Sequence, residues 1–73
     1  MLNVGILTIS DRGWRGERED KSGTVIRECF HAPNAQVLEY DIVPDEKDII
    51  ADRLRNWADK GGINVIITTG GTG

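Results

Sequence analysis

The residues best suited to chemistry are Gly70-Gly71-Thr72-Gly73, which follow a segment at 64–69 that is rich in β-branched residues. Glycines lack a Cβ, so their backbone N–H groups can approach a ligand closely, and successive N–H groups of this kind bind anions. Thr72 adds a hydroxyl group. A tight turn is the alternative interpretation, but three glycines in four residues exceed what a turn requires. The loop is therefore predicted to bind a ligand.

Two other segments carry charged side chains that could also bind a ligand or take part in a reaction. Asp45 has two open interpretations: it can cap the following helix, with Asp48 at the third helical position, or it can hold a metal ion or orient a reacting group. The segment Ser10-Asp11-Arg12 is equally open. Arg12 could bind a phosphate through two parallel hydrogen bonds, or it could pair with an acid of its own loop.

Three single residues also have more than one interpretation. Trp14 lies in a polar loop, where it could stack on a flat heterocycle, pack in a subunit interface or fold back onto its own domain, and the last is favoured. With one histidine, His31, and one cysteine, Cys29, no zinc site is expected. Cys29 is predicted to belong to the core rather than to act as a nucleophile.

The elements that must position these residues alternate between strands and helices. Apolar runs at 4–9 and 64–69 predict strands buried on both faces, and a partly alternating run at 36–43 predicts a strand nearer the sheet edge. Helical spacing of apolar residues predicts helices over about 20–31 and 46–60. The predicted core-facing residues are Val25, Ile26, Cys29 and Phe30 in the first helix, and Ile50, Leu54, Trp57 and Ala58 in the second.

The order strand-helix-strand-helix-strand predicts an α/β fold with a parallel sheet and right-handed crossovers. Asp20 or Ser22 is the expected N-cap of the first helix, and Gly61-Gly62 ends the second. The strands of a parallel sheet all end at one edge, where open α/β sheets bind ligands. The three segments with candidate site residues each follow a strand, so they are expected to meet at that edge.

Composition narrows the class of protein. A chain of 73 residues is at most one small domain, and its net charge of −3 argues against nucleic-acid binding, which needs clustered Lys and Arg. No apolar run approaches the roughly 20 residues of a membrane-spanning helix. The start lacks the pattern of a secretion signal, and the single cysteine excludes an internal disulfide. We expect a cytoplasmic protein that binds neither nucleic acid nor membrane.

Four motifs occur in an order and spacing that resemble a known family. They are Ile9-Ser10-Asp11-Arg12, then Arg15-Gly16-Glu17 through Asp20-Lys21-Ser22-Gly23, then Val43-Pro44-Asp45-Glu46, then Thr68-Thr69-Gly70-Gly71-Thr72-Gly73. On these motifs the chain is similar to the MogA/MoaB branch of molybdenum-cofactor biosynthesis proteins, which also resembles the G domain of gephyrin. The resemblance implies that residues 1–73 are the N-terminal half of a single molybdopterin-binding domain. It implies a three-layer α/β/α fold with a mixed sheet, represented here by its first three strands.

The resemblance also implies an activity. Enzymes of this family transfer AMP from Mg-ATP to the phosphate of molybdopterin, so Mg²⁺, ATP and molybdopterin are the expected cofactor, co-substrate and substrate. A homotrimer or homohexamer is expected, with a molybdenum-insertion protein as a further partner. A non-catalytic molybdopterin-binding or scaffold module is the alternative.

Family motifs assign roles to individual residues. Asp45 matches the aspartate that the family needs for catalysis, and it is also a candidate Mg²⁺ ligand. The residues that match or line the ligand pocket are Ser10, Asp11, Arg12, Thr69, Gly70, Gly71, Thr72 and Gly73. A second acid of the family's reaction follows the glycine loop, beyond residue 73. Residues 1–73 alone are therefore expected to be inactive, with the strand at 65–67 partly unpaired.

Overall fold

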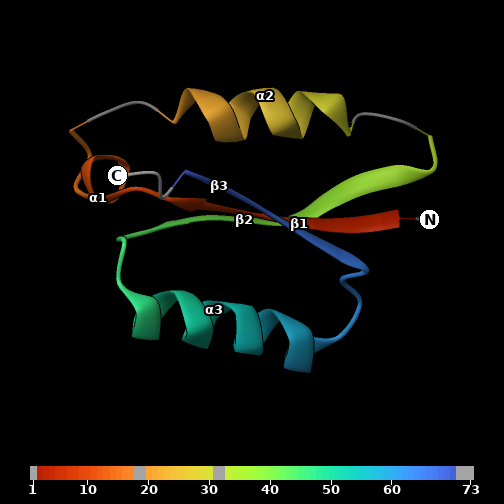
Figure 1. Ribbon diagram of the computed structural model, residues 1–73. Coiled ribbons are helices and arrows are strands. Elements are labelled where there is room, and N and C mark those ends of the chain that lie inside the picture. Colours follow the sequence, from red (N-terminus) through yellow and green to blue (C-terminus); the bar gives the residue numbers. More distant parts are fainter. Residues whose placement is uncertain (1, 18–19, 31–32, 71–73) are drawn as a thin grey trace.

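The computed structural model of the chain describes residues 2–17, 20–30 and 33–70. Within these ranges the elements are β1 (Leu2–Ile9), α1 (Asp11–Trp14), α2 (Lys21–Cys29), β2 (Ala35–Val43), α3 (Lys47–Lys60) and β3 (Val65–Gly70). The described strands form one sheet in the order β2-β1-β3, and both strand pairs are parallel. Helix α2 covers one face of the sheet and α3 the other (Figure 1). The predicted α/β/α arrangement and parallel sheet are thus confirmed.

The central strand β1 is buried on both faces, as its apolar run predicts. Val4, Ile6 and Leu7 have no exposed surface, and Thr8 retains only 4%. On the α3 face, Leu7 packs with Val43 and Trp57. The half-buried residues around this cluster are Ile9, Ile50, Leu54, Ile63 and Ile66. The larger part of the described core therefore lies between the sheet and α3.

Helix α3 packs through the stripe that its sequence predicts, except at one position. Ile50, Leu54 and Trp57 face the sheet, whereas Ala58 is exposed, so its predicted burial is wrong. The indole of Trp57 lies directly against Gly5 of β1, because a Cβ added at Gly5 would be 2.9 Å from Trp57 Cε3. Gly61 follows the helix with a φ of 79°, which confirms the predicted glycine stop.

Strand β2 contains one residue more than the part of β1 that it pairs with. Val4 lies opposite Val37, but the next residue, Gly5, lies opposite Glu39. Leu38 is therefore the extra residue of a β-bulge. A shift of one residue sends every later side chain of the strand to the opposite face of the sheet.

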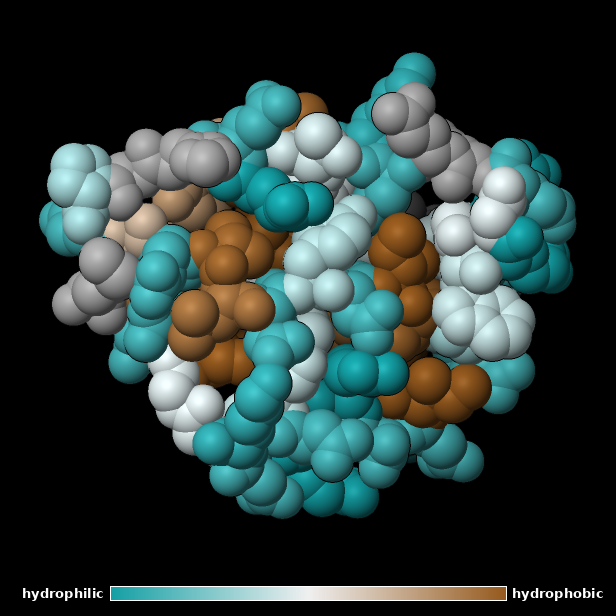
Figure 2. All heavy atoms as spheres, turned by 180° about the vertical axis from the view of Figure 1, so that it is seen from behind, coloured by the Kyte–Doolittle hydropathy of each residue, from teal (hydrophilic) through white to brown (hydrophobic). Residues whose placement is uncertain are grey.

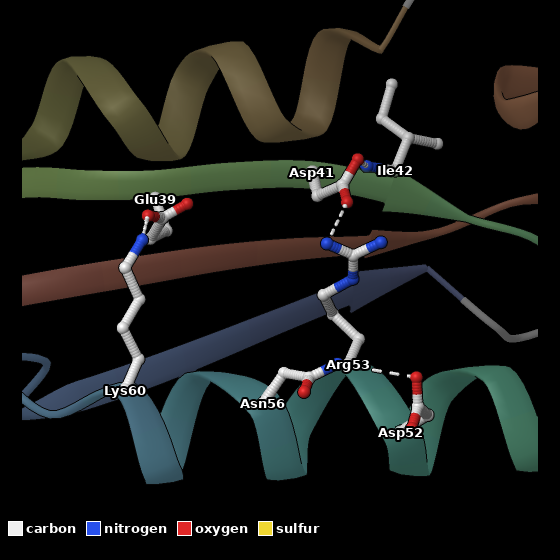
Figure 3. Close-up of polar contacts among 7 residues, drawn as sticks. All are labelled: Glu39, Asp41, Ile42, Asp52, Arg53, Asn56 and Lys60. Atoms are coloured by element: carbon white, nitrogen blue, oxygen red, sulfur yellow. Dashed lines mark hydrogen bonds and ion pairs between the residues drawn. The ribbon is translucent and has the colours of Figure 1, made fainter.

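The bulge decides where the polar residues of β2 point. Glu39 and Asp41 face α3, where Glu39 pairs with Lys60, and Asp41 Oδ2 lies 2.9 Å from Arg53 Nη1 (Figure 3). Tyr40, between them, faces α2 instead, where its hydroxyl meets Asp20. β2 is an outer strand of the described sheet, as its polar residues led us to expect.

Helix α2 packs through only part of the predicted stripe. Val25 is 58% exposed and Cys29 is also exposed, so their predicted place in the core is wrong. The residues that turn toward the sheet are the buried Gly23 and the half-buried Ile26 and Phe30, which are spaced three and four residues apart. The helix is therefore rotated about its own axis relative to the prediction. The contacts of its N-cap, described below, cause this rotation.

The apolar side chains that remain exposed do not form one surface. Each described element carries one large exposed apolar side chain: Leu2, Trp14, Val25, Leu38, Ile49 and Val65. On the face shown in Figure 2 the apolar surface is divided by polar side chains. Among the described strands β3 pairs with β1 alone, so one of its edges has no described partner, as the sequence led us to expect. None of the described helices has the length and apolar character needed to cross a membrane.

Candidate active site

The carboxyl ends of the three described strands lie level with one another. Ile9 of β1 pairs with Val43 of β2 on one side and with Gly70 of β3 on the other. The predicted convergence is therefore confirmed for the described residues that follow β1 and β2 and for the last residue of β3. β1 is the central strand, with β2 on one side and β3 on the other, so the two successive connections lead to opposite sides of β1. Open α/β sheets bind ligands at such a switch point.

Directly after β1 the chain forms the short helix α1, where the sequence predicted a loop. Ser10 is its N-cap, and Ser10 Oγ accepts a hydrogen bond of 3.0 Å from the Gly13 N–H. The backbone N–H of Ser10 donates to the Val43 carbonyl at 2.9 Å. Four residues are too few to show helical periodicity, which is why the pattern did not predict this helix. The Ser10 hydroxyl accepts as a cap and keeps its own proton to donate.

Asp11 and Asp45 are joined across the edge of the sheet. The backbone N–H of Asp45 donates to Asp11 Oδ1 at 2.9 Å. The N-cap of α3 is Glu46, and no side chain caps that helix, so the capping interpretation of Asp45 is wrong. Asp45 lies one residue too early to cap. Its carboxylate is exposed and forms no hydrogen bond or ion pair with any described residue, which leaves it available to a ligand.

Gly70, the first glycine of the predicted ligand-binding loop, needs its lack of a side chain. Its φ is +88°, a left-handed conformation that other residues rarely adopt. A Cβ at this position would also collide with the carbonyl oxygen of Ile9. Thr69 is half-buried in β3 and pairs with Thr8. Gly71, Thr72 and Gly73 lie outside the described residues, so their ligand-binding role stays a prediction.

Arg12 is exposed at the same edge of the sheet. Its side chain forms no ion pair with the part of the chain that the structure describes, whereas Arg15 Nε lies 2.8 Å from Glu17 Oε2 in the same loop. The interpretation in which Arg12 neutralises an acid of its own loop is therefore not supported within the described residues. The phosphate-binding interpretation remains.

Trp14 does not fold back onto the domain, so that expectation is wrong. Its side chain is 58% exposed at the end of α1. The side of α1 that faces the sheet is taken by Gly13, whose Cβ, if present, would lie 3.5 Å from Ile42 Cγ2. Successive side chains of a helix point about 100° apart, so the side chain of Trp14, which follows Gly13, points toward solvent.

A cluster that no sequence motif indicated lies at the start of α2. Asp20 is the N-cap, and its Oδ1 accepts a 3.0 Å hydrogen bond from the Gly23 N–H. Its Oδ2 accepts from Thr8 Oγ1 at 2.7 Å and from the Tyr40 hydroxyl. We call these four residues the Asp20 junction. Asp20 was predicted as a possible cap, but nothing local indicated its partners on two different strands.

The Asp20 junction explains the rotation of α2. A Cβ added to Gly23 would lie 2.6 Å from the Tyr40 hydroxyl oxygen, so the helix backbone packs directly on that side chain. The Arg27 guanidinium lies 5.0 Å from the centre of the Tyr40 ring and adds a cation–π contact on the same side of the helix. With Gly23 and Arg27 held against the sheet, Val25 and Cys29 turn outward.

Metal ligands are sparse in the described ranges. No group of three or more His, Cys, Asp or Glu side chains is placed to hold a metal ion there. Magnesium, however, is commonly bound by one or two carboxylates together with substrate phosphates. The exposed carboxylate of Asp45 fits that kind of site. Cys29 is a free, exposed cysteine at the last position of α2, and His31 lies outside the described residues.

The chain is similar in sequence to known proteins. Residues 5–73 match a family described as "Probable molybdopterin binding domain". The chain is 48% identical over 72 residues to the molybdopterin adenylyltransferase of Pyrococcus furiosus, and 47% identical over 74 residues to the molybdenum cofactor synthesis protein cinnamon of Drosophila melanogaster. These alignments cover 99% of the chain in both cases.

Solved structures agree with these alignments. The crystal structure of the molybdopterin biosynthesis enzyme MoaB from Thermus thermophilus superposes with a TM-score of 0.91 at 49% identity, over the whole of this chain. The tungsten cofactor synthesizing protein MoaB from Pyrococcus furiosus gives a TM-score of 0.85 at 44% identity. The chain spans 46% and 44% of those two proteins, 41% of the Pyrococcus adenylyltransferase and 12% of cinnamon.

Proposed function

The chain belongs to the molybdopterin-binding domain family, and on that premise we propose that the full-length protein is a molybdopterin adenylyltransferase. It binds molybdopterin and transfers AMP from Mg-ATP to the terminal phosphate of that pterin. In this step an oxygen of the molybdopterin phosphate bonds to the α-phosphorus of ATP, and pyrophosphate leaves. Relatives named as molybdopterin adenylyltransferases support the reaction. A relative named for tungsten cofactor synthesis is compatible with the same chemistry in a tungsten pathway.

The observation that carries this proposal is the place of Asp45. Its exposed carboxylate has no partner among the described residues, and it stands at the edge where β1, β2 and β3 end together. A carboxylate held at such an edge without a structural bond is suited to a cation or a reacting group. A cap or a buried ion pair would have given Asp45 a structural explanation, and neither is found in the described ranges.

The remaining residues take roles that follow from charge. Phosphoryl-type transfer depends on positioning and on neutralising the charge of the phosphates. Magnesium, when bound, supplies most of that neutralisation, with Asp45 as the residue to hold it. Arg12 is placed to contact a phosphate, and Ser10 has a proton to donate to one. Gly70 starts the loop whose N–H groups bind molybdopterin in this proposal.

Assembly and location belong to the same proposal. We expect the full-length protein to form a homotrimer or homohexamer in the cytoplasm and to hand its adenylylated product to a molybdenum-insertion protein. Support for these expectations comes from the family resemblance alone. Light scattering on the full-length protein measures the assembly directly.

The decisive experiment compares Asp45→Asn with Asp48→Asn in the full-length protein. Both variants remove one negative charge near the start of α3, but Asp48 lies one turn away in the helix. We expect Asp45→Asn to lower kcat for pyrophosphate release by about 10²-fold, as loss of one electrostatic group at a reacting centre does. Asp48→Asn should stay close to wild type, and Asp45→Asn should still bind molybdopterin.

Each other outcome has a definite meaning. Normal turnover by Asp45→Asn would remove this residue from the mechanism. A wild-type protein that binds molybdopterin but releases no pyrophosphate would be the non-catalytic binding or scaffold module. A wild-type protein that does not bind molybdopterin would refute both functions.

A further inference from the structure

Asp11 and Asp45 lie in the segments that follow two neighbouring strands and are separated by 34 positions in the chain. Asp11 is the first residue of α1, directly after β1, and Asp45 lies in the turn between β2 and α3. Among the described hydrogen bonds and ion pairs, the one that joins them is the 2.9 Å bond from the Asp45 N–H to Asp11 Oδ1. This bond links the side chain of one loop to the backbone of the other.

The two ends of this bond are held very differently. Asp11 is well fixed, because Ser10 before it is bonded to β2 at 2.9 Å and caps α1 through the Gly13 N–H at 3.0 Å. Asp45 has less support. The next residue, Glu46, folds back through its N–H to the Pro44 carbonyl at 2.8 Å, but the Asp45 carboxylate has no described partner. Of the two described bonds on the Pro44–Asp45 peptide group, the one to Glu46 stays within the turn, so the bond to Asp11 is the one that ties this peptide to another element.

We infer that Asp11 is a positioning residue: its carboxylate holds the Asp45 backbone so that the Asp45 carboxylate points correctly at the reacting phosphates. This inference rests on the proposed adenylyl transfer. It assigns Asp11 a role different from the ligand contact that its motif suggests. Because catalysis is sensitive to displacements of about 1 Å, losing this bond should slow turnover by about 10- to 100-fold. The affected peptide is exposed, so water can replace the lost acceptor and the fold should tolerate the change.

Three variants of the full-length protein test this role. Asp11→Ala removes the acceptor, whereas Asp11→Asn removes the charge and keeps an oxygen acceptor for the Asp45 N–H. Glu17→Ala is the matched control, because it removes the same charge from the same loop and its side chain pairs with Arg15 instead.

We expect Asp11→Ala to lower kcat by about 10-fold or more, with the KM of both substrates nearly unchanged. Asp11→Asn should recover most of the kcat that Asp11→Ala loses, because it restores the acceptor, and Glu17→Ala should keep most of the wild-type kcat. The inference is overturned if Asp11→Asn is as slow as Asp11→Ala, or if Asp11→Ala raises KM with kcat unchanged. A loss no larger than that of Glu17→Ala would overturn it as well.

A second measurement separates this inference from the proposed function. Hydrogen exchange of the Asp45 amide, followed by NMR, reports the bond whether or not the protein turns over. The amide should exchange about 10-fold or more faster in Asp11→Ala than in Asp11→Asn or Glu17→Ala, because only that variant lacks an acceptor. An inactive wild-type protein would refute the adenylyl transfer. Equal exchange of the Asp45 amide in all three variants would refute the positioning role of Asp11.

Discussion

The Asp20 junction gives the most quantitative prediction about the fold. Replacing Tyr40 by Phe removes one hydroxyl that donates to the Asp20 carboxylate and leaves the aromatic ring, with its Arg27 contact 5.0 Å away, in place. A hydrogen bond to a charged group contributes about 1.5–3 kcal/mol when buried. Here Asp20 is only half-buried and keeps its bonds to Thr8 and Gly23, so we expect Tyr40→Phe to lower the free energy of unfolding by about 1–2 kcal/mol.

Replacing Asp20 itself should cost more than replacing Tyr40. Asp20→Ala removes the N-cap of α2, which contributes about 1 kcal/mol. It also leaves the hydroxyl of Thr8, only 4% exposed, without its acceptor, which adds about 1–3 kcal/mol. These two terms come to about 2–4 kcal/mol, and the lost bond from Tyr40 adds about 1–2 kcal/mol, as estimated above. Asp20→Asn should fall between wild type and Asp20→Ala, because asparagine caps helices about as well as aspartate.

The assay is urea unfolding of the full-length protein, followed by circular dichroism at one fixed protein concentration. A lower midpoint with an unchanged slope would report stability alone. Two results would refute the reasoning: an unchanged midpoint in Tyr40→Phe, or a loss in Asp20→Ala no greater than in Tyr40→Phe. Either would mean that Asp20 is held by solvent rather than by the two strands.

The same unfolding assay tests two glycines. Gly5→Ala should lose about 1–3 kcal/mol, because its Cβ would lie 2.9 Å from Trp57 Cε3, and Trp57→Leu should relieve part of that loss in the double variant. Equal losses in both backgrounds would show that the indole is not the cause. Gly70→Ala should lose more stability than Gly61→Ala: both positions have a positive φ, but only a Cβ at Gly70 would strike another residue, the carbonyl of Ile9. Equal losses at Gly70 and Gly61 would contradict the clash.

The strands and α3 could be predicted from the sequence because their signals are local. The runs at 4–9 and 64–69 are both largely apolar, and both form strands. The predicted burial on both faces holds for β1 but is wrong for β3, in which every residue is exposed or half-buried, because β1 is its single described neighbour. The apolar spacing of 50–57 fits one face of a helix. Parallel pairing then brings the segments that follow the three strands to one edge, so the place of the candidate site could be predicted before any side chain was located.

The orientation of α2 could not be predicted in the same way. Its apolar residues fit more than one helical face, and the choice between those faces depends on Thr8 and Tyr40, which are 12 and 20 positions from Asp20. Local periodicity contains no information about contacts at that distance. The prediction therefore placed Val25 and Cys29 in the core, where the structure has Gly23.

The role of Asp45 was open because the start of a helix is uncertain by a residue or two in sequence. One position separates an N-cap from a residue whose carboxylate remains available. The structure starts α3 at Lys47, with Glu46 as its N-cap, and that single residue removes Asp45 from the capping role. The bond to Asp11 had no local signal at all.

The β-bulge at Leu38 has a consequence for how this strand can vary in evolution. If Leu38 were deleted, Val37 would still lie opposite Val4 and Glu39 opposite Gly5, so both halves of β2 would keep their partners. A deletion between 39 and 43 would instead turn the preceding or following side chains to the wrong face and separate them from α3 or from Asp20. Relatives of this domain that differ by one residue within β2 should therefore gain or lose it at the position of Leu38.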